Sequence, residues 1–499
     1  MTESEAPTAP ASGRLDRGVI ITGLVVVSGL IMVILDTTIV NVALNTLGSD
    51  LDSPLSTTQW VVTGYMLAVG TVIPVSGWAL DRFGTKRVWL FSLTMFVIGS
   101  ALCAFAWSMP VLIVFRIIQG LGGGMLMPTG QTIITRAAGP DRMGRMMAVL
   151  GIPMLLGPVF GPVIGGVLVE YTSWEWIFLV NVPVGALAIV LAVRLLGPGD
   201  EHAHTDRLDL RGLVLLAGGL VALLYGLSRA SAQASFAKTD VIAWLVGGGV
   251  LIALFVVSSL LRAERSVIDV RLFRNRLFAG GSVTIFLVGI GLFGGMLMLP
   301  LYYQSVRLEG AAAAGLLLAP QGLGAAVAMP IAGRITDRFG AGWVVPVGVV
   351  LAVLGTIAFT QVGTDTSYVW LSAALFVRGL GLGGTMMPTI AASYSQLTPK
   401  LVSRAAPTIS AIQQVGGALG GALLVVVLTE TMNDKLASAG LPAGGGGGNV
   451  TSVPPAMHDR LAPLLASSFG EAFWTAAILI AVIIVPAVLL PRRPAAAAG

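Results

Sequence analysis

Long apolar stretches recur along the chain, and each is close to the ~20 residues that an α-helix needs to cross a bilayer. Examples are residues 18–44, 60–80 and 88–107, which short polar segments separate. This pattern predicts an all-α polytopic membrane protein with fourteen membrane-spanning helices. The helices are expected to begin near residues 18, 56, 88, 110, 143, 175, 210, 240, 277, 310, 342, 367, 402 and 471.

Composition agrees with a chain that is solvated by lipid. Of its 499 residues, 55% are hydrophobic and 11% are charged, and the mean hydropathy is +0.89. The net charge of +5 does not indicate nucleic acid binding, because the basic residues lie in short loops between the spans. The single cysteine and a missing phosphate-loop motif argue against metal and ATP sites. We therefore expect no cofactor, no metal and no enzymatic activity.

The distribution of basic residues predicts the orientation. Most of the 29 lysines and arginines fall in the terminal segments and in alternate loops, as cytoplasmic segments do. We expect a multi-pass protein of the cell membrane with both termini in the cytoplasm. The polar segment 1–17 is expected to be a cytoplasmic tail before a retained first helix, because the apolar stretch is too long for a signal peptide.

An internal repeat divides the chain into two halves. The run PVSGWALDRFG from Pro74 resembles PIAGRITDRFG from Pro330, and FRIIQGLGGGMLMPT from Phe115 resembles FVRGLGLGGTMMPT from Phe376. Such a repeat predicts two six-helix bundles with a substrate site between them. We expect these bundles at 18–196 and 277–491, with two inserted helices at 210–262. An external loop is expected at 431–468, with a glycine run at 444–448.

Four segments carry a resemblance to a known family: LDTTIVNVAL, GWALDRFGTKR, FRIIQG and GPVFGPVIGG. The chain resembles the fourteen-helix drug:H+ antiporters of the major facilitator superfamily, of the EmrB/QacA type. The resemblance implies a major facilitator fold that exports small lipophilic or cationic compounds in exchange for protons. It also implies a protein that works as a monomer, and it leaves an accessory partner in the envelope open.

Asp36 is the only acidic residue well inside an apolar span. Because desolvation disfavours a charged carboxylate, Asp36 is expected to bind and release a proton and to face a cavity with Thr37 and Asn41. The alternative is a purely structural role, in which Asp36 forms an ion pair with a neighbouring helix. Arg116 is expected at a similar depth, and the resemblance implies that this arginine, in a motif that continues to Gln119, takes part in proton transfer. Its alternative role is to tie helices together through backbone carbonyls.

Two motifs are candidates for conformational change. The loop after the second helix resembles a loop of the family that holds one conformation closed, and its core is repeated in the second half. The fifth helix carries glycines at GxxxG spacing, with prolines between them. The alternatives are topogenic charge for the loops and simple close packing for the helix. The predicted gating residues are Gly77, Asp81, Arg82, Gly84, Arg87, Gly157, Pro158, Gly161, Pro162, Gly165, Asp337 and Arg338.

Further polar side chains in or near the spans are candidates for contact with the substrate, although hydrogen bonds between helices explain them equally well. They are Tyr65, Gln119, Tyr302, Gln304 and Gln413. Export of a lipid, siderophore or other metabolite on the same scaffold stays open as an alternative function. Uptake of sugars is disfavoured, because no dense set of polar residues lines the spans. A non-transporting receptor is also disfavoured, because no soluble sensing domain is visible.

Overall fold

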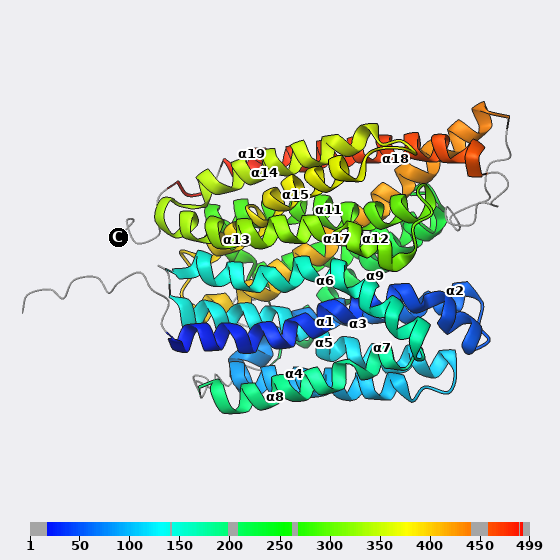
Figure 1. Cartoon of the computed structure of the whole chain (residues 1–499). Coiled ribbons are helices and arrows are strands. Elements are labelled where there is room, and N and C mark those ends of the chain that lie inside the picture. Colours follow the sequence, from blue (N-terminus) through cyan, green and yellow to red (C-terminus); the bar gives the residue numbers. More distant parts are fainter. Residues whose placement is uncertain are drawn as a thin grey trace, which may run out of the picture.

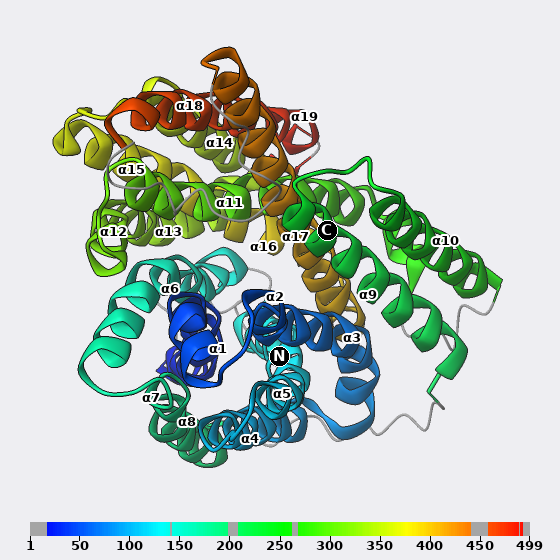
Figure 2. The same ribbon diagram turned by 90° about the vertical axis from the view of Figure 1, so that its right-hand side faces the viewer.

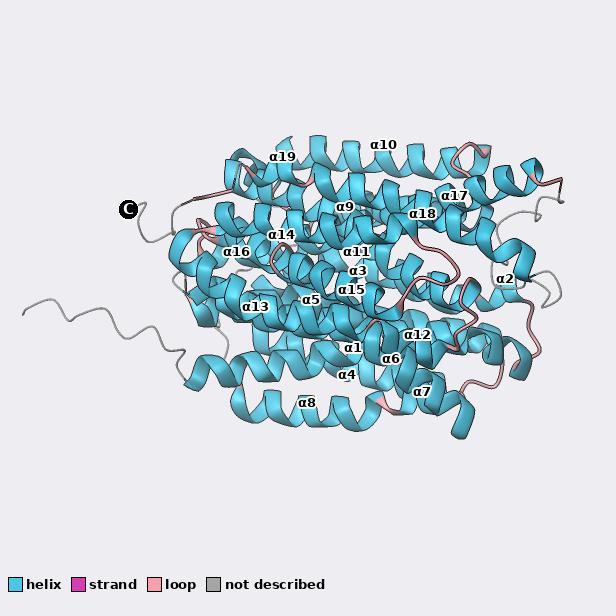
Figure 3. Cartoon of the chain, turned by 45° about the horizontal axis from the view of Figure 1, so that its top comes forward, coloured by secondary structure: helices cyan, strands magenta, loops and turns pink. Residues whose placement is uncertain are grey.

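The computed structural model describes residues 17–139, 142–197, 208–261, 268–440, 458–488 and 490–492. Within these ranges all regular elements are helices, as Figure 3 shows. Two sequence predictions fall elsewhere: the tail up to residue 16 and the glycine run 444–448 lie outside the described residues.

The elements in chain order are α1 (Arg17–Asp50), α2 (Leu55–Thr58), α3 (Trp60–Phe83), α4 (Thr85–Ala104), α5 (Met109–Ala138), α6 (Met143–Tyr171), α7 (Trp176–Leu179), α8 (Asn181–Leu195), α9 (Leu210–Gln233), α10 (Thr239–Leu261), α11 (Arg276–Ser305), α12 (Ala311–Leu317), α13 (Ala319–Phe339), α14 (Ala341–Ile357), α15 (Tyr368–Gly383), α16 (Met386–Tyr394), α17 (Pro399–Ser438), α18 (His458–Val482) and α19 (Ile484–Ala487). Two short 3₁₀ helices lie at Val270–Arg274 and Ala358–Gln361.

The described chain contains 13 helices, some made of two successive segments, that are long and apolar enough to cross a membrane. The 29-residue helix α6 adds one more in the expected place, with a shorter apolar part at Phe160–Tyr171. In chain order these helices correspond to the fourteen predicted ones. The sixth predicted helix is α7 followed by α8, and the tenth is α12 followed by α13.

The predicted start of the last helix was wrong. It was expected near residue 471, whereas α18 begins at His458, and α17 continues to Ser438. Part of the segment 431–468 that was expected as a loop is therefore helical. The extension of α17 after Thr431 is polar, so hydropathy falls there before the helix ends, whereas α18 is already apolar from Leu461, which the sequence reading overlooked. Hydrogen bonding within a helix continues wherever the backbone allows it, in water as well as in lipid.

The long helices lie side by side along a common direction (Figure 1), and the first turn of α1 and the helix α19 are at the same end. We call this the proximal end and the opposite one the distal end. Viewed along the helices, α1 to α8 form one group and α11 to α19 a second, with α9 and α10 at their side (Figure 2). Helix α9 packs against α10 and against one helix of each group, α3 and α17.

The outer surface of the bundle carries large apolar side chains, such as Val246 and Leu254 of α10 and Val347 of α14. In water such a surface would be unstable, whereas in a bilayer it matches the lipid tails. Polar side chains gather inside instead, among them Asp36, which is 0% exposed. The candidate site lies among these buried polar groups.

Candidate functional site

Asp36 and Arg116 form an ion pair in the interior of the first group of helices. Nη1 of Arg116, on α5, donates to Oδ2 of Asp36, on α1, over 2.6 Å, and the two side chains are 1% and 0% exposed. The sequence predicted only that the two residues share a depth. The structure shows that they touch, which means that neither charge is left alone in the apolar bundle.

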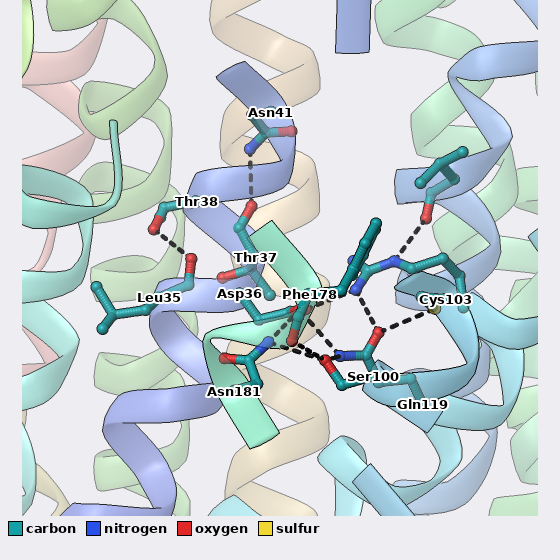
Figure 4. A network of polar contacts seen from close by, with 12 residues as sticks. Leu35, Asp36, Thr37, Thr38, Asn41, Ser100, Cys103, Gln119, Phe178 and Asn181 are labelled. Carbon is teal, nitrogen blue, oxygen red and sulfur yellow. Dashed lines mark hydrogen bonds and ion pairs between the residues drawn. The ribbon is translucent and has the colours of Figure 1, made fainter. Parts of the chain in front are cut away.

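Three neutral side chains complete the arrangement around the carboxylate (Figure 4). Nε2 of Gln119 and Nδ2 of Asn181 donate to Oδ1 of Asp36 over 2.9 and 3.0 Å. Both amides also donate to Oγ of Ser100, which in turn donates to the carbonyl of Phe178. We call Asp36, Arg116, Gln119, Asn181 and Ser100 the Asp36 cluster.

Arg116 also contacts residues of the neighbouring helix α3. Its Nε donates to the carbonyl of Val61 over 3.3 Å, and its guanidinium lies 4.2 Å from the centre of the Tyr65 ring. Nη1 also donates to Oε1 of Gln119 over 2.6 Å. The arginine therefore ties α3 to α1 and α5 as well as neutralising Asp36. Its part in proton transfer stays a prediction.

The predicted cavity residues do not all gather at this cluster. Thr37 is partly exposed and Asn41 is exposed on α1, whereas the carboxylate of Asp36 is fully buried and faces its partners instead of open space. In the second group of helices, the hydroxyl of Tyr302 donates to the carbonyl of Gly363 near the distal end of α11. Gln304 is the second-last residue of α11 and is partly exposed, and Gln413 is buried on α17.

The glycines of α6 lie against α1 beside the Asp36 cluster. A Cβ atom at Gly157 would meet Ile34, one at Gly161 would meet Thr38, and one at Gly165 would lie 3.2 Å from the carbonyl oxygen of Ile39. The hydroxyl of Thr38 donates to the carbonyl of Gly157 over 3.2 Å. The glycines therefore let α6 approach α1 one turn to either side of Asp36.

Two prolines of α6 lie between these glycines. Pro162 is partly exposed, and the side chain of Pro158 lies outside the described part of the structure.

The loop motifs join the two groups of helices at the proximal end. Asp81, at the end of α3, accepts hydrogen bonds from Oγ of Ser403 over 2.6 Å and from Nε of Arg404 over 3.1 Å, both on α17. Deeper in the molecule, the hydroxyl of Tyr394 donates to Oε1 of Gln131 over 2.8 Å. These contacts connect residues that are more than 250 positions apart.

The repeated motif makes a matching connection. Asp337, at the end of α13, accepts from the backbone N–H of Gly144 over 2.7 Å and from Nε of Arg145 over 2.8 Å, at the start of α6. Each motif thus ends one helix of its own half and holds the beginning of a helix in the other half: Asp337 the first turn of α6, and Asp81 the second turn of α17. A carboxylate at a helix N-terminus also interacts well with the helix dipole.

The remaining predicted gating residues shape these two turns. Gly84 has φ 80° and Gly340, at the equivalent place, has φ 87°, a conformation that strains any residue with a side chain. Gly77 is buried in α3, whereas Arg82 and Arg87 are exposed. Arg338 is also exposed and lies 5.1 Å from the ring of Phe339.

Sequence reasoning missed several contributors to these sites. Ser100 and Asn181 were not singled out, although a serine and an asparagine inside apolar spans are a usable signal. The partners Arg145 and Arg404 were counted only as topogenic charge. Within the described residues, no group of three or more metal-ligating side chains occurs.

Comparison with known proteins shows the family to which the chain belongs. Residues 26–424 match the model of the Major Facilitator Superfamily. The chain is 42% identical to the "Multidrug resistance protein B homolog" of Mycobacterium tuberculosis over 497 residues, which cover 97% of this chain and 92% of the relative. It is 29% identical to the "Tetracenomycin C resistance and export protein" of Streptomyces glaucescens, over 90% of this chain and 85% of the relative.

A solved structure shares the architecture. The human organic anion transporter MFSD10 superimposes with a TM-score of 0.60 over 93% of this chain and 100% of its own. At 14% sequence identity, this likeness is one of fold alone.

Proposed function

Because the chain belongs to the Major Facilitator Superfamily, a family of membrane transporters, we propose that it exports small lipophilic or cationic compounds in exchange for protons. The cargo class rests on relatives whose names describe multidrug resistance and the export of tetracenomycin C. The chain holds both halves of the fold, so a single copy suffices for the cycle.

The observation that carries proton coupling is the buried Asp36 cluster. Asp36 sits inside a membrane span, and its charge is stabilised by Arg116 and two amide donors. Protonation removes the negative charge, so the arginine loses its counterion and the link between α1 and α5 weakens. Proton binding at Asp36 thereby changes the free energy of one arrangement of the helices relative to another, which is what coupling requires.

The loop contacts supply the two-state element. With the termini in the cytoplasm, as the basic residues predict, the proximal end is the cytoplasmic one. Asp81 and Asp337 then hold the cytoplasmic ends of the two groups together. These ion pairs are partly exposed and short-ranged, so they can break and re-form during the cycle. We assign the described arrangement to a state that is closed toward the cytoplasm.

The glycine face of α6 links the two events. The glycine face packs on α1 around Asp36, and the helix that carries it, α6, begins at the Asp337 contact. A movement of α1 that follows protonation is therefore transmitted along α6 to the cytoplasmic latch, because close backbone packing leaves no room for independent motion.

The test is the uptake of a fluorescent lipophilic cation into inverted, energised membrane vesicles. Wild-type vesicles should concentrate the dye, and both a protonophore and the substitution Asp36→Asn should lower that uptake by ~10-fold or more. Asp50→Asn is the matched control, because Asp50 is exposed at the far end of the same helix.

Two results would count against the proposal. Protonophore-sensitive uptake that persists in Asp36→Asn would place the coupling elsewhere. Wild-type vesicles that stay idle with a chemically broad panel of dyes would remove the drug cargo and favour export of a lipid or metabolite.

A further inference from the structure

A second arginine is buried in the other group of helices and lacks a counterion. Arg378, on α15, is 1% exposed. Its Nε donates to Oγ1 of Thr356 over 3.2 Å, and its Nη1 donates to Oε1 of Gln321. Its Nη2 is buried and has no hydrogen-bond partner among the described residues, and no carboxylate there pairs with it. The guanidinium therefore has an unused donor group inside the bundle.

The surroundings of this arginine repeat part of the Asp36 cluster. The loop motifs of the two halves are 256 residues apart, and at the same spacing Ser100 corresponds to Thr356 and Gly99 to Gly355. A Cβ atom at Gly99 would meet the backbone of Gln119, and one at Gly355 would meet the backbone of Arg378. Gln119 donates to Ser100, and Arg378 donates to Thr356. Arg378 thus occupies the place of Gln119, one turn along the helix from the place of Arg116.

The member that the second half lacks is the acid. On α11, which is the first helix of the second half as α1 is of the first, Gly295 lies against the guanidinium. A Cβ atom on Gly295 would run into Nη2 of Arg378 and lie 3.0 Å from its Cζ. A glycine therefore stands beside the guanidinium, and the unused donor Nη2 has no carboxylate at this contact.

Electrostatics decides what such an arrangement requires. A buried cation without a partner is costly, and in the first half Asp36 removes that cost. In the second half no side chain of the described residues does so. A guanidinium presents its donors in a planar fork that suits carboxylates and other small anions. The second half is therefore complete only when an anion comes from outside the chain.

We propose that Arg378, with Gln321 and Thr356, is a binding subsite for a small monoanion or a carboxylate group. Two sources share this chemistry: inorganic chloride, and the carboxylate of a transported compound. The anion takes the role in the second half that Asp36 has in the first. Because the arginine is almost fully buried here, the anion enters in an arrangement of helices that is more open around α11 and α15.

The experiment measures binding by the full-length protein, purified in detergent and kept in sodium sulfate, whose dianion is neither a monoanion nor a carboxylate. Sodium chloride and sodium benzoate are titrated separately, with sodium sulfate at equal ionic strength as the reference, and the apparent Tm is recorded. A ligand that binds only the folded state raises Tm with the logarithm of its concentration. Arg378→Gln should weaken the apparent affinity for the effective anion by ~10-fold or more, because charge-assisted hydrogen bonds are lost.

A pair of substitutions at Gly295 tests the same idea without removing the arginine. Gly295→Asp supplies a built-in counterion and should make Tm independent of added anions. Gly295→Asn has nearly the same size but no charge, so its Tm should still rise with the anion. If Arg378→Gln yields no folded protein, this comparison decides alone.

Every outcome of the titrations is informative. A response to chloride alone, to benzoate alone or to both supports the subsite and identifies its source. No response in the wild type, or equal responses in the wild type and Arg378→Gln, would overturn the proposal and leave the arginine as a tie between helices. Equal anion responses in Gly295→Asp and Gly295→Asn would overturn it as well. Since no transport is measured, these results are independent of proton-coupled export.

Discussion

Replacing Asp36 by asparagine removes one charge from a buried ion pair and keeps the size of the side chain. In the wild type Asp36 accepts hydrogen bonds from Arg116 at 2.6 Å, Gln119 at 2.9 Å and Asn181 at 3.0 Å, and it is fully buried. The substitution leaves the guanidinium without a counterion. Removing one partner of such a pair costs about 3–5 kcal/mol of folding stability.

The reverse change, Arg116→Gln, leaves the carboxylate alone instead and is also expected to destabilise the protein. In the double variant Asp36→Asn/Arg116→Gln neither charge remains. Its loss of stability should therefore be smaller than the sum of the two single losses, by about 1–3 kcal/mol. This coupling energy is the measurable signature of the contact.

The assay is reversible unfolding of the purified protein in mixed micelles, followed by circular dichroism across a titration of denaturing detergent. Asp50→Asn is the matched control, since Asp50 is exposed and should change stability by no more than ~0.5 kcal/mol. If the single losses simply add in the double variant, or if Asp36→Asn behaves like the control, the ion pair does not carry the energy that its burial implies.

Three further predictions concern the latch and the helix packing. Asp81→Asn should open the proximal end. A cysteine placed at Gln131 should then react faster with a maleimide than the same cysteine in a chain that keeps Asp81, and the native Cys103 is buried in both. An unchanged rate would contradict the latch. Gly161→Ala should abolish dye transport because its Cβ meets α1, whereas Gly166→Ala, with its nearest atom at 3.8 Å, should keep most of it; equal activities would remove the role of the glycine face. Gly84→Ala should cost about 1–2 kcal/mol at φ 80° in the unfolding assay, and a neutral effect would mean that the turn can relax.

Much of the architecture follows from the sequence because lipid imposes a simple rule. A helix must present ~20 apolar residues to cross the bilayer, so hydropathy alone locates the spans and their order. The rule also exposes exceptions, and Asp36 was found because no other acid lies so far inside a span. It fails outside the membrane, where the end of α17 continues as a helix although its residues are polar.

The neighbours of each helix are decided only by the tertiary structure. Both lipid tails and other helices are apolar, so hydropathy does not tell which face of a span turns inward or which helix it meets. Asn181 bonds to Asp36, and Ser100 bonds to Asn181, from helices that are distant in sequence from α1, and no spacing rule connects them.

The two buried arginines show the same division most sharply. From the sequence they are two similar residues in a repeat, and Gly295 is one glycine among 64. Only the packed structure shows that Arg116 meets a carboxylate, whereas Arg378 meets a glycine and keeps a free donor. The physical reason is that the electrostatic free energy of a buried charge depends on the groups within a few ångströms of it, and folding sets those distances.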